Sequence, residues 1–266
     1  YDGIYAENYV KYIKELAEDK KVKAVVFRIN SPGGSANASD EILFEIQQLK
    51  KKKPVIVSFG DYAASGGYYI AMGADKIYSE PNTLTGSIGV FGVIPNFKEM
   101  ANKNGIRSEL ISTNANSNFY SPLTGLSSGA VSMMTKSVES TYKRFVYFVT
   151  QNRKKTFEQI DEIGGGRIWS GTKAKELGLV DELGTLQDAI NYAAKQAKLS
   201  SDYNVGVYPS KKTAFEQFFE GMNEEEISTK ILKTKLGEDN FKTFEMLSNP
   251  KVKNNVVMAL PIRVEL

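Results

Sequence analysis

Residues 22–35 read VKAVVFRINSPGGS and residues 55–71 read VIVSFGDYAASGGYYIA, and these two stretches decide the fold. Each opens on a β-branched, apolar run, which is typical of a strand buried in a parallel sheet. Each run leads into a loop that contains glycine, and each loop opens a helix. Short buried strands that alternate with helices at this tight spacing predict an α/β fold with a mostly parallel sheet.

The rest of the chain extends this pattern. Apolar residues at helical spacing predict helices over 7–19, 130–150, 172–177 and 186–198, and strands are expected over 76–79 and 85–93. The helix after the first loop should bury Ile42, Leu43, Ile46 and Leu49. We expect one domain over residues 1–200. A small α+β appendage should follow over residues 201–266, starting with a strand-like segment at 205–208.

Two absences limit the chemistry that the chain can perform. The 266 residues include no His and no Cys, so a Ser-His-Asp triad, a Cys-His pair and zinc sites built from these ligands are excluded. The formal net charge of +3 is small for this length, so no nucleic acid or other polyanion is implied as a partner. We expect neither a metal nor a cofactor.

The two loops carry the elements of an acyl-transfer site. Glycines such as Gly33 and Gly66 let backbone N–H groups point outward, as an oxyanion hole requires. Ser65 begins a helix beside small residues, which predicts an exposed hydroxyl suited to nucleophilic attack. The alternative is that the glycines only permit tight turns and that Ser65 only caps the helix. Two such loops about 30 residues apart favour the site.

These motifs resemble those of the signal peptide peptidase A family in the ClpP/crotonase superfamily. The resemblance rests on NSPGGS, on GDYAASGGYYIA, on TGSIGV at residues 85–90 and on RIWSGTKAKELGLVDELG at residues 167–184. It covers residues 1–198 and is weak beyond residue 200. It implies a ClpP/crotonase-like superhelix of ββα units, whose first strand is missing from this chain.

The resemblance also implies a role for each matching residue. Ser65 matches the nucleophile, and Gly33 and Gly66 match the positions whose amides form the oxyanion hole, with Gly34 beside them. Ser87 matches a second serine that helps to orient the catalytic lysine, although it could also be a hydroxyl that caps a turn.

The general-base lysine does not follow the family pattern. Single-domain members carry it shortly before a Ser-Pro dipeptide, where this chain has Ser117 within residues 114–122. Lys98, Lys103 and Lys136 lie outside that motif. Long members with two repeats place the serine in the C-terminal repeat and the lysine in the N-terminal one. The chain therefore resembles the C-terminal, serine-bearing half of such a protein, and its lysine would come from a missing half or a neighbouring subunit.

The expected function is that of a serine peptidase with a Ser/Lys mechanism, and without a lysine from elsewhere this chain alone would be inactive. The resemblance implies apolar peptide substrates such as released signal peptides, and a ring-shaped homo-oligomer. It also implies a membrane anchor outside this chain and a catalytic domain on the periplasmic side of a bacterial cell envelope. Two alternatives stay open: a crotonase-type acyl-CoA enzyme, and a non-catalytic module that only helps to assemble the ring.

Overall fold

The computed structural model describes residues 4–114, 119–200 and 202–209. Its helices are α1 (Ala6–Glu18), α2 (Ala36–Lys50), α3 (Gly66–Ala71), α4 (Lys98–Lys103), α5 (Ser128–Arg153), α6 (Phe157–Ile163), α7 (Gly171–Glu176) and α8 (Leu186–Gln196). Its strands are β1 (Val25–Ser31), β2 (Val55–Ala64), β3 (Lys76–Ser79), β4 (Leu84–Gly86), β5 (Tyr120–Ser121), β6 (Gly125–Leu126), β7 (Ile168–Ser170) and β8 (Glu182–Leu183).

The chain divides into two compact units, residues 1–205 and residues 206–266. The strand-like segment expected at 205–208 forms no strand in the described residues, and the rest of the expected appendage, 210–266, lies outside them. The first unit holds all the helices and strands of the described residues. Within the described residues, no helix is long and apolar enough to cross a membrane.

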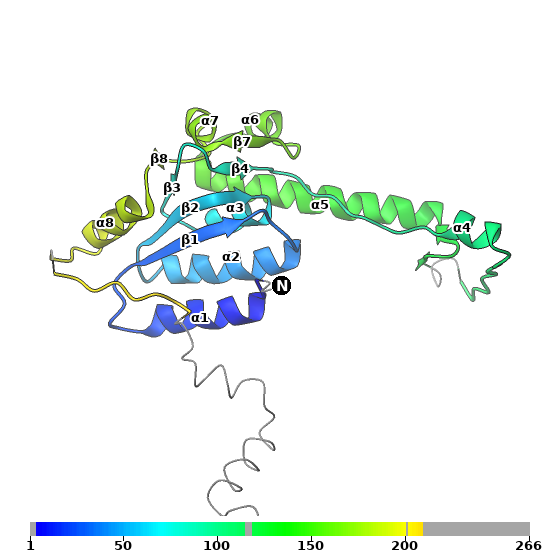
Figure 1. Ribbon diagram of the computed structural model, residues 1–266, viewed down its shortest axis with the longest axis horizontal. Helices are drawn as coiled ribbons and strands as arrows, with labels where there is room; N and C mark the ends of the chain where they lie inside the picture. The colour runs from blue at the N-terminus through cyan, green and yellow to red at the C-terminus, as the bar shows by residue number, and fades with distance from the viewer. Residues whose placement is uncertain (1–3, 115–118, 201, 210–266) are drawn as a thin grey trace, which may run out of the picture. The chain divides into compact units, whose positions relative to one another are not determined.

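A six-stranded sheet forms the centre of this unit (Figure 1). β2 pairs in parallel with β1 along one edge, and with β3 and then β4 along the other. β8 continues in parallel beside β3, whereas β7 runs antiparallel to β4. The prediction of a mostly parallel sheet is therefore confirmed.

Helices cover both faces of the sheet. The predicted apolar face of α2, formed by Ile42, Leu43, Ile46 and Leu49, is at most 5% exposed and belongs to the main core. α1 lies on the outer side of α2 (Figure 1). On the opposite face, α8 packs Ala189 and Ala193 against Ile56 of β2 and Tyr78 of β3. Burying both faces is what parallel strands rich in valine and isoleucine require.

β2 is longer than expected, and this correction matters for the site. The loop predicted over residues 60–65 is strand as far as Ala64, because Tyr62–Ala64 pair with Leu84–Gly86 of β4. The Thr83 and Thr85 hydroxyls add hydrogen bonds to the carbonyls of Gly60 (2.7 Å) and Ala63 (2.6 Å). β2 therefore leads directly into Ser65.

β4 is shorter than expected. The strand predicted over residues 85–93 ends at Gly86, whose φ is +81°, and Ser87 follows with a φ of +49°. Two consecutive residues at positive φ turn the backbone out of the extended conformation of a strand. The residues beyond them leave the sheet.

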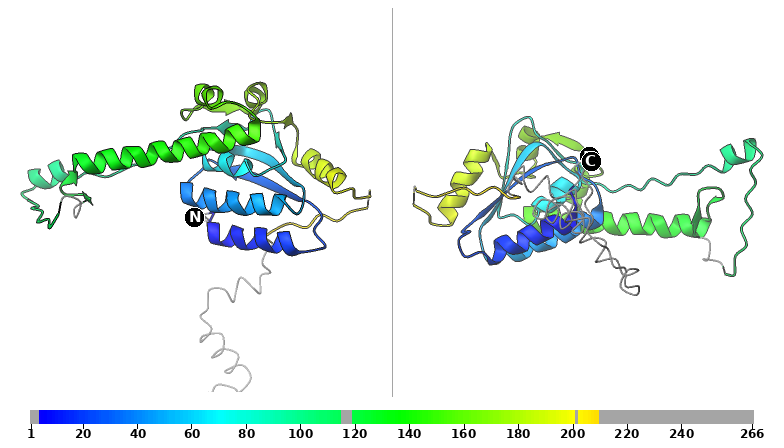
Figure 2. Two further views of the ribbon diagram at one scale, coloured as in Figure 1. Left: turned by 180° about the vertical axis from the view of Figure 1, so that it is seen from behind. Right: turned by 60° about the horizontal axis from the view of Figure 1, so that its bottom comes forward.

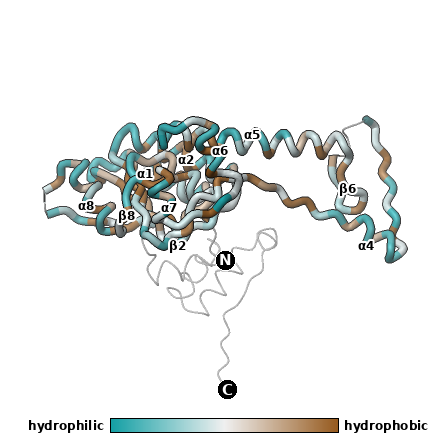
Figure 3. Tube along the Cα trace, turned by 90° about the horizontal axis from the view of Figure 1, so that it is seen from above, coloured by the Kyte–Doolittle hydropathy of each residue, from teal (hydrophilic) through white to brown (hydrophobic). Residues whose placement is uncertain are grey.

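α5 joins the core to a projecting part of the unit, which we call the arm (residues 90–114 and 119–140). The C-terminal half of α5 buries Phe145, Val146 and Val149 in the core. The N-terminal half extends away from the sheet towards α4 and the β5–β6 hairpin (Figures 1 and 2). Apolar residues follow the connection from the core to α4 (Figure 3), and Phe91 and Val93 there are 86% and 81% exposed.

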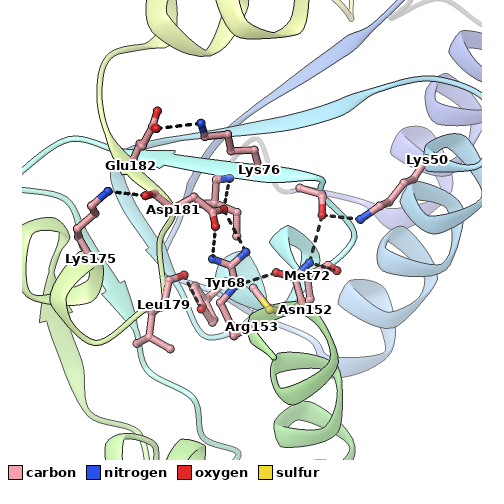
Figure 4. A network of polar contacts seen from close by, with 12 residues as sticks. Lys50, Tyr68, Met72, Lys76, Asn152, Arg153, Lys175, Leu179, Asp181 and Glu182 are labelled. Carbon is pink, nitrogen blue, oxygen red and sulfur yellow. Dashed lines mark hydrogen bonds and ion pairs between the residues drawn. The ribbon is translucent and has the colours of Figure 1, made fainter. Parts of the chain in front are cut away.

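A polar network fixes the core end of α5 (Figure 4). Arg153, with a side chain only 5% exposed, donates to both carboxylate oxygens of Asp181 at 3.1 Å. Asn152 donates to the carbonyls of Met72 and Ala74. Because a buried charge needs a partner, this pairing fixes the direction in which the helix leaves the core.

Candidate active site

The two glycine loops meet at one edge of the sheet. β1 and β2 are parallel neighbours, so their carboxyl ends lie side by side, with Gly33 just past the first and Ser65 just past the second. A Cβ added to Gly33 would lie 2.7 Å from the Ser65 Cβ and 2.8 Å from the Gly66 nitrogen. A Cβ added to Gly66 would lie 3.3 Å from the Gly34 nitrogen. The structure thus brings together four of the five site residues named from the sequence.

The first loop needs glycine at Gly33 for two reasons. Its φ is +108°, a conformation that residues with a side chain rarely adopt, and its approach to Ser65 leaves no room for a Cβ. Gly34 is exposed, and a Cβ there would meet nothing within 4 Å. The space in front of Gly34 is therefore open to a ligand.

The amides of this loop differ in availability. The Gly33 N–H donates to the Ser31 hydroxyl at 3.2 Å. The Gly34 and Gly66 N–H groups donate to no other described residue. Gly66 begins α3, and the first amides of a helix have no partner inside it. Two close, unused donors therefore remain beside Ser65.

Ser65 is held in an uncommon backbone conformation, with φ +49° and ψ −118°. Its N–H donates to the Gly86 carbonyl (2.9 Å), and its own carbonyl accepts from Tyr69 N–H (2.8 Å). The Ser65 side chain makes no capping hydrogen bond, although the residue precedes α3. The interpretation of Ser65 as a helix cap is therefore wrong. A strained, half-buried serine whose hydroxyl has no capping function is typical of a functional position.

Ser87 lies directly after the residue that binds the Ser65 amide. Its N–H donates to the Arg167 carbonyl (2.7 Å), and one residue further on the Ile88 carbonyl accepts from Gly166 N–H (2.9 Å). The glycine-rich segment before β7 therefore holds the Ser87 backbone at its positive φ. The TGSIGV motif at residues 85–90 indicates Ser87 but does not reveal this support. The run Gly164–Gly166 was its only signal in the sequence.

No described lysine takes the place of the expected general base in the family motif. Ser117, which occupies that place, lies outside the described residues. Lys98 and Lys103 belong to α4 and Lys136 to the N-terminal half of α5, so all three lie in the arm rather than at the sheet edge (Figure 1). The part of the chain that the structure describes also holds no cluster of three or more acidic residues that could bind a metal ion.

Comparisons with known proteins agree with this geometry. The family model for "Peptidase family S49" matches residues 47–200, and the model for "Clp protease" matches residues 2–85. The second match, together with the parallel sheet, confirms the predicted ClpP-like α/β fold.

Three curated relatives match about three quarters of the chain. The chain is 43% identical to "Protease 4" of Salmonella typhi over 79% of its own length and 34% of the relative. It is 37% identical to "Putative signal peptide peptidase SppA" of Enterococcus faecium over 79% of its own length and 61% of the relative. It is 38% identical to "Serine protease SPPA, chloroplastic" of Arabidopsis thaliana over 74% and 29%. The chain thus spans about a third of the first and third of these relatives.

Proposed function

The chain belongs to peptidase family S49, and from that premise we propose that it carries the nucleophile of a serine peptidase, Ser65. The observation that carries the proposal is the close contact between the two glycine loops, which brings the Gly34 and Gly66 nitrogens together next to Ser65. In the proposed reaction, the Ser65 Oγ attacks the scissile carbonyl carbon of a peptide. The carbonyl oxygen becomes an oxyanion, and the amine of the peptide bond leaves with a proton.

We assign the oxyanion chiefly to the Gly34 and Gly66 amides, since neither donates to another described residue. Gly33 contributes the turn that brings Gly34 forward, while its own amide is shared with Ser31. Preorganised donors of this kind stabilise the charge that develops in the transition state, and losing one typically costs 10²–10³-fold in rate.

The proton of Ser65 would pass to a neutral lysine amine. Burial lowers the pKa of a lysine, which lets the amine act as a base near neutral pH. We propose that this lysine comes from a segment outside this chain or from a neighbouring subunit, with Ser87 orienting it. Two observations support this assignment. Ser117 stands where single-domain members of the family carry the lysine, and Lys98, Lys103 and Lys136 all lie in the arm.

We propose apolar peptides, such as released signal peptides, as substrates. One support is the name of the Enterococcus faecium relative. Another is an apolar surface next to Ser65: Tyr62 pairs with Leu84, and Ile168 lies one strand further on. Their side chains are 48%, 42% and 58% exposed. Exposed apolar side chains on adjacent strands could bind the apolar side chains of an extended peptide.

The arm supports assembly into a homo-oligomer, for which we propose a ring. Its exposed large apolar residues are Phe91, Val93, Phe97, Met100, Ile106, Leu110, Ile111, Phe119, Tyr120, Leu123, Val131 and Met133. A monomer rarely leaves so many apolar side chains in water. A neighbouring copy would cover them.

We further propose that the protein functions at a bacterial cell envelope, with its catalytic domain on the periplasmic side, anchored by a segment outside this chain.

Hydrolysis of a short apolar fluorogenic peptide tests the proposal. We would compare this chain alone with a longer protein that includes sequence upstream of Tyr1. Activity confined to the longer protein and abolished by Ser65→Ala would support a site completed by a lysine from outside. Full activity of the chain alone would point to a lysine within it. Turnover unchanged by Ser65→Ala would overturn the proposal and favour the assembly module.

A further inference from the structure

Three helices meet at one carboxylate. The Tyr69 hydroxyl of α3 donates a hydrogen bond to Oδ1 of Asp40 in α2 at 2.7 Å. Arg144 of α5 donates its Nε to the same oxygen at 3.1 Å and its Nη2 to Oδ2 at 2.6 Å. We call these three residues the Asp40 junction. They connect three separate segments of the chain through a single side chain.

Two of the three helices carry the catalytic loops. α2 begins right after the loop with Gly33 and Gly34, and α3 begins right after Ser65. Tyr69 lies one helical turn after Ser65, and its N–H donates to the Ser65 carbonyl at 2.8 Å. The junction therefore lies about one helical turn behind both halves of the proposed site.

A close contact also links α2 to the second loop. Ser39, next to Asp40, donates its hydroxyl to the Ser35 carbonyl at 3.0 Å. A Cβ on Gly66 would lie only 2.5 Å from the Ser39 oxygen. Because α2 and the Ser65 turn already touch here, a small shift of α2 would move the Gly34 and Gly66 amides relative to each other.

The third helix, α5, carries the arm. The Tyr69 ring packs edge-on against Phe145 at 4.9 Å and Phe148 at 5.5 Å between ring centroids. The Arg144 guanidinium lies over the Phe148 ring, 5.7 Å from its centroid. The ring packing holds Tyr69 in place without its hydroxyl, so the hydroxyl is available to direct Asp40. Burial, with Asp40 beside it, raises the pKa of Tyr69 and keeps the hydroxyl a donor.

The junction is poorly placed to stabilise the fold. The side chains of Arg144 and Asp40 are 58% and 34% exposed, and exposed ion pairs contribute little to stability. A bidentate guanidinium–carboxylate contact does, however, fix the relative orientation of the two side chains as well as their distance. The geometry thus suits alignment better than stabilisation.

We propose that Arg144 is a positioning residue of the active site. Through Asp40 and Tyr69, it lets α5, the helix that carries the arm, set the spacing between the Gly34 loop and Ser65. The inference rests on the proposed peptidase function. It also gives the arm a role beyond assembly, because any partner that shifts α5 would act on the catalytic loops through this contact.

The test uses the form of the protein that hydrolyses the fluorogenic peptide. Tyr69→Phe keeps the ring packing and removes only the hydroxyl. Arg144→Ala removes the cation, whereas Arg144→Lys keeps the charge but cannot make the bidentate contact. We expect kcat to fall about tenfold for Tyr69→Phe and Arg144→Ala, on the scale of one hydrogen bond to a charged group, with KM little changed. Arg144→Lys should restore part of the loss. The double variant should lose little more than either single one, since both act through Asp40.

Lys14→Ala is the matched control. It breaks another ion pair to α2, Lys14–Glu45 at 3.3 Å, in which the Lys14 side chain is 61% exposed and the Glu45 side chain 13%, without touching α3 or α5. It should leave kcat unchanged. If all the variants lose activity only in proportion to their loss of Tm, or if KM rises while kcat is constant, the positioning role is wrong. Failure of the unmodified protein to hydrolyse the peptide would instead contradict the proposed function itself.

Discussion

Gly33 and Ser65, 32 positions apart in the chain, lie so close that a Cβ on Gly33 would be 2.7 Å from the Cβ of Ser65. The parallel pairing of β1 with β2 creates this contact, since it places the ends of both strands at one edge. The sheet topology therefore places the proposed nucleophile beside the proposed oxyanion hole. Substitutions at these two residues should distinguish steric clash, backbone strain and loss of catalysis as separate effects.

Gly33→Ala should both destabilise the protein and abolish hydrolysis. The new methyl group would meet the Gly66 nitrogen at 2.8 Å, on a backbone with φ +108°. We expect a loss of about 2 kcal/mol in the free energy of unfolding and at least about 10²-fold in kcat. Gly34→Ala is the control, because nothing lies within 4 Å of the new methyl group. Equal destabilisation of both variants in denaturant unfolding would contradict the geometry.

Ser65→Gly should be more stable than Ser65→Ala, although both should be inactive. Only glycine relieves the backbone strain at φ +49°, which costs about 1–3 kcal/mol for a residue with a side chain. Part of this gain is offset by the greater freedom of glycine in the unfolded chain. We expect a difference of about 1 kcal/mol in urea unfolding. A less stable glycine variant would show that Ser65 is not strained.

Tyr68→Phe should cost about 1 kcal/mol in the free energy of unfolding, because it leaves a buried carbonyl without its donor. The Tyr68 side chain is fully buried, and its hydroxyl donates to the Leu179 carbonyl at 2.8 Å. Burial raises the pKa of Tyr68 well above its usual range, so the hydroxyl remains a donor. Tyr147→Phe, at a residue 56% exposed, is the control and should be nearly neutral. Thermal unfolding of both variants decides the point.

The start of α8 should contribute stability that depends on pH. The Thr185 N–H and hydroxyl each donate to the Asp188 carboxylate at 2.7 Å, which lowers the pKa of Asp188. A lowered folded pKa means that the contribution is complete above the ordinary value of ~3.9 and is lost as the pH falls through the folded value. Asp188→Asn cannot titrate. The difference in Tm between the two proteins should therefore be constant near neutral pH and shrink below about pH 4. A difference that grows towards acid would contradict the sign.

Much of the local structure could be predicted because its determinants are neighbours in the chain. The apolar face of α2, Ile42 to Leu49, follows from helical spacing. Ser170, a residue type that favours the N-cap position, accepts from Lys173 N–H at the start of α7, and Gly178, at φ +72°, lies just after that helix. These features depend on contacts within a few residues, and the sequence displays them directly.

The predicted bounds of β2 and β4 were wrong because a segment distant in the chain determines where each strand ends. β2 continues through residues 60–64 because β4, 20 residues later, pairs with it. β4 stops at Gly86 because positive φ angles there, held by the Gly166–Arg167 segment, turn the chain away. Neither influence leaves a periodic signal in the segment that it changes.

The sequence alone was enough for the α/β class, for several of the helices and strands, and for the exclusion of His and Cys chemistry. Three features depend on how the chain folds: the contact of Gly33 with Ser65, the absence of a capping hydrogen bond from the Ser65 hydroxyl, and the ion pair of Arg144 with Asp40 across 104 positions. The physical reason is the range of the interactions. Periodicity and capping depend on neighbours in the chain, whereas an active site depends on which strands and helices pack side by side.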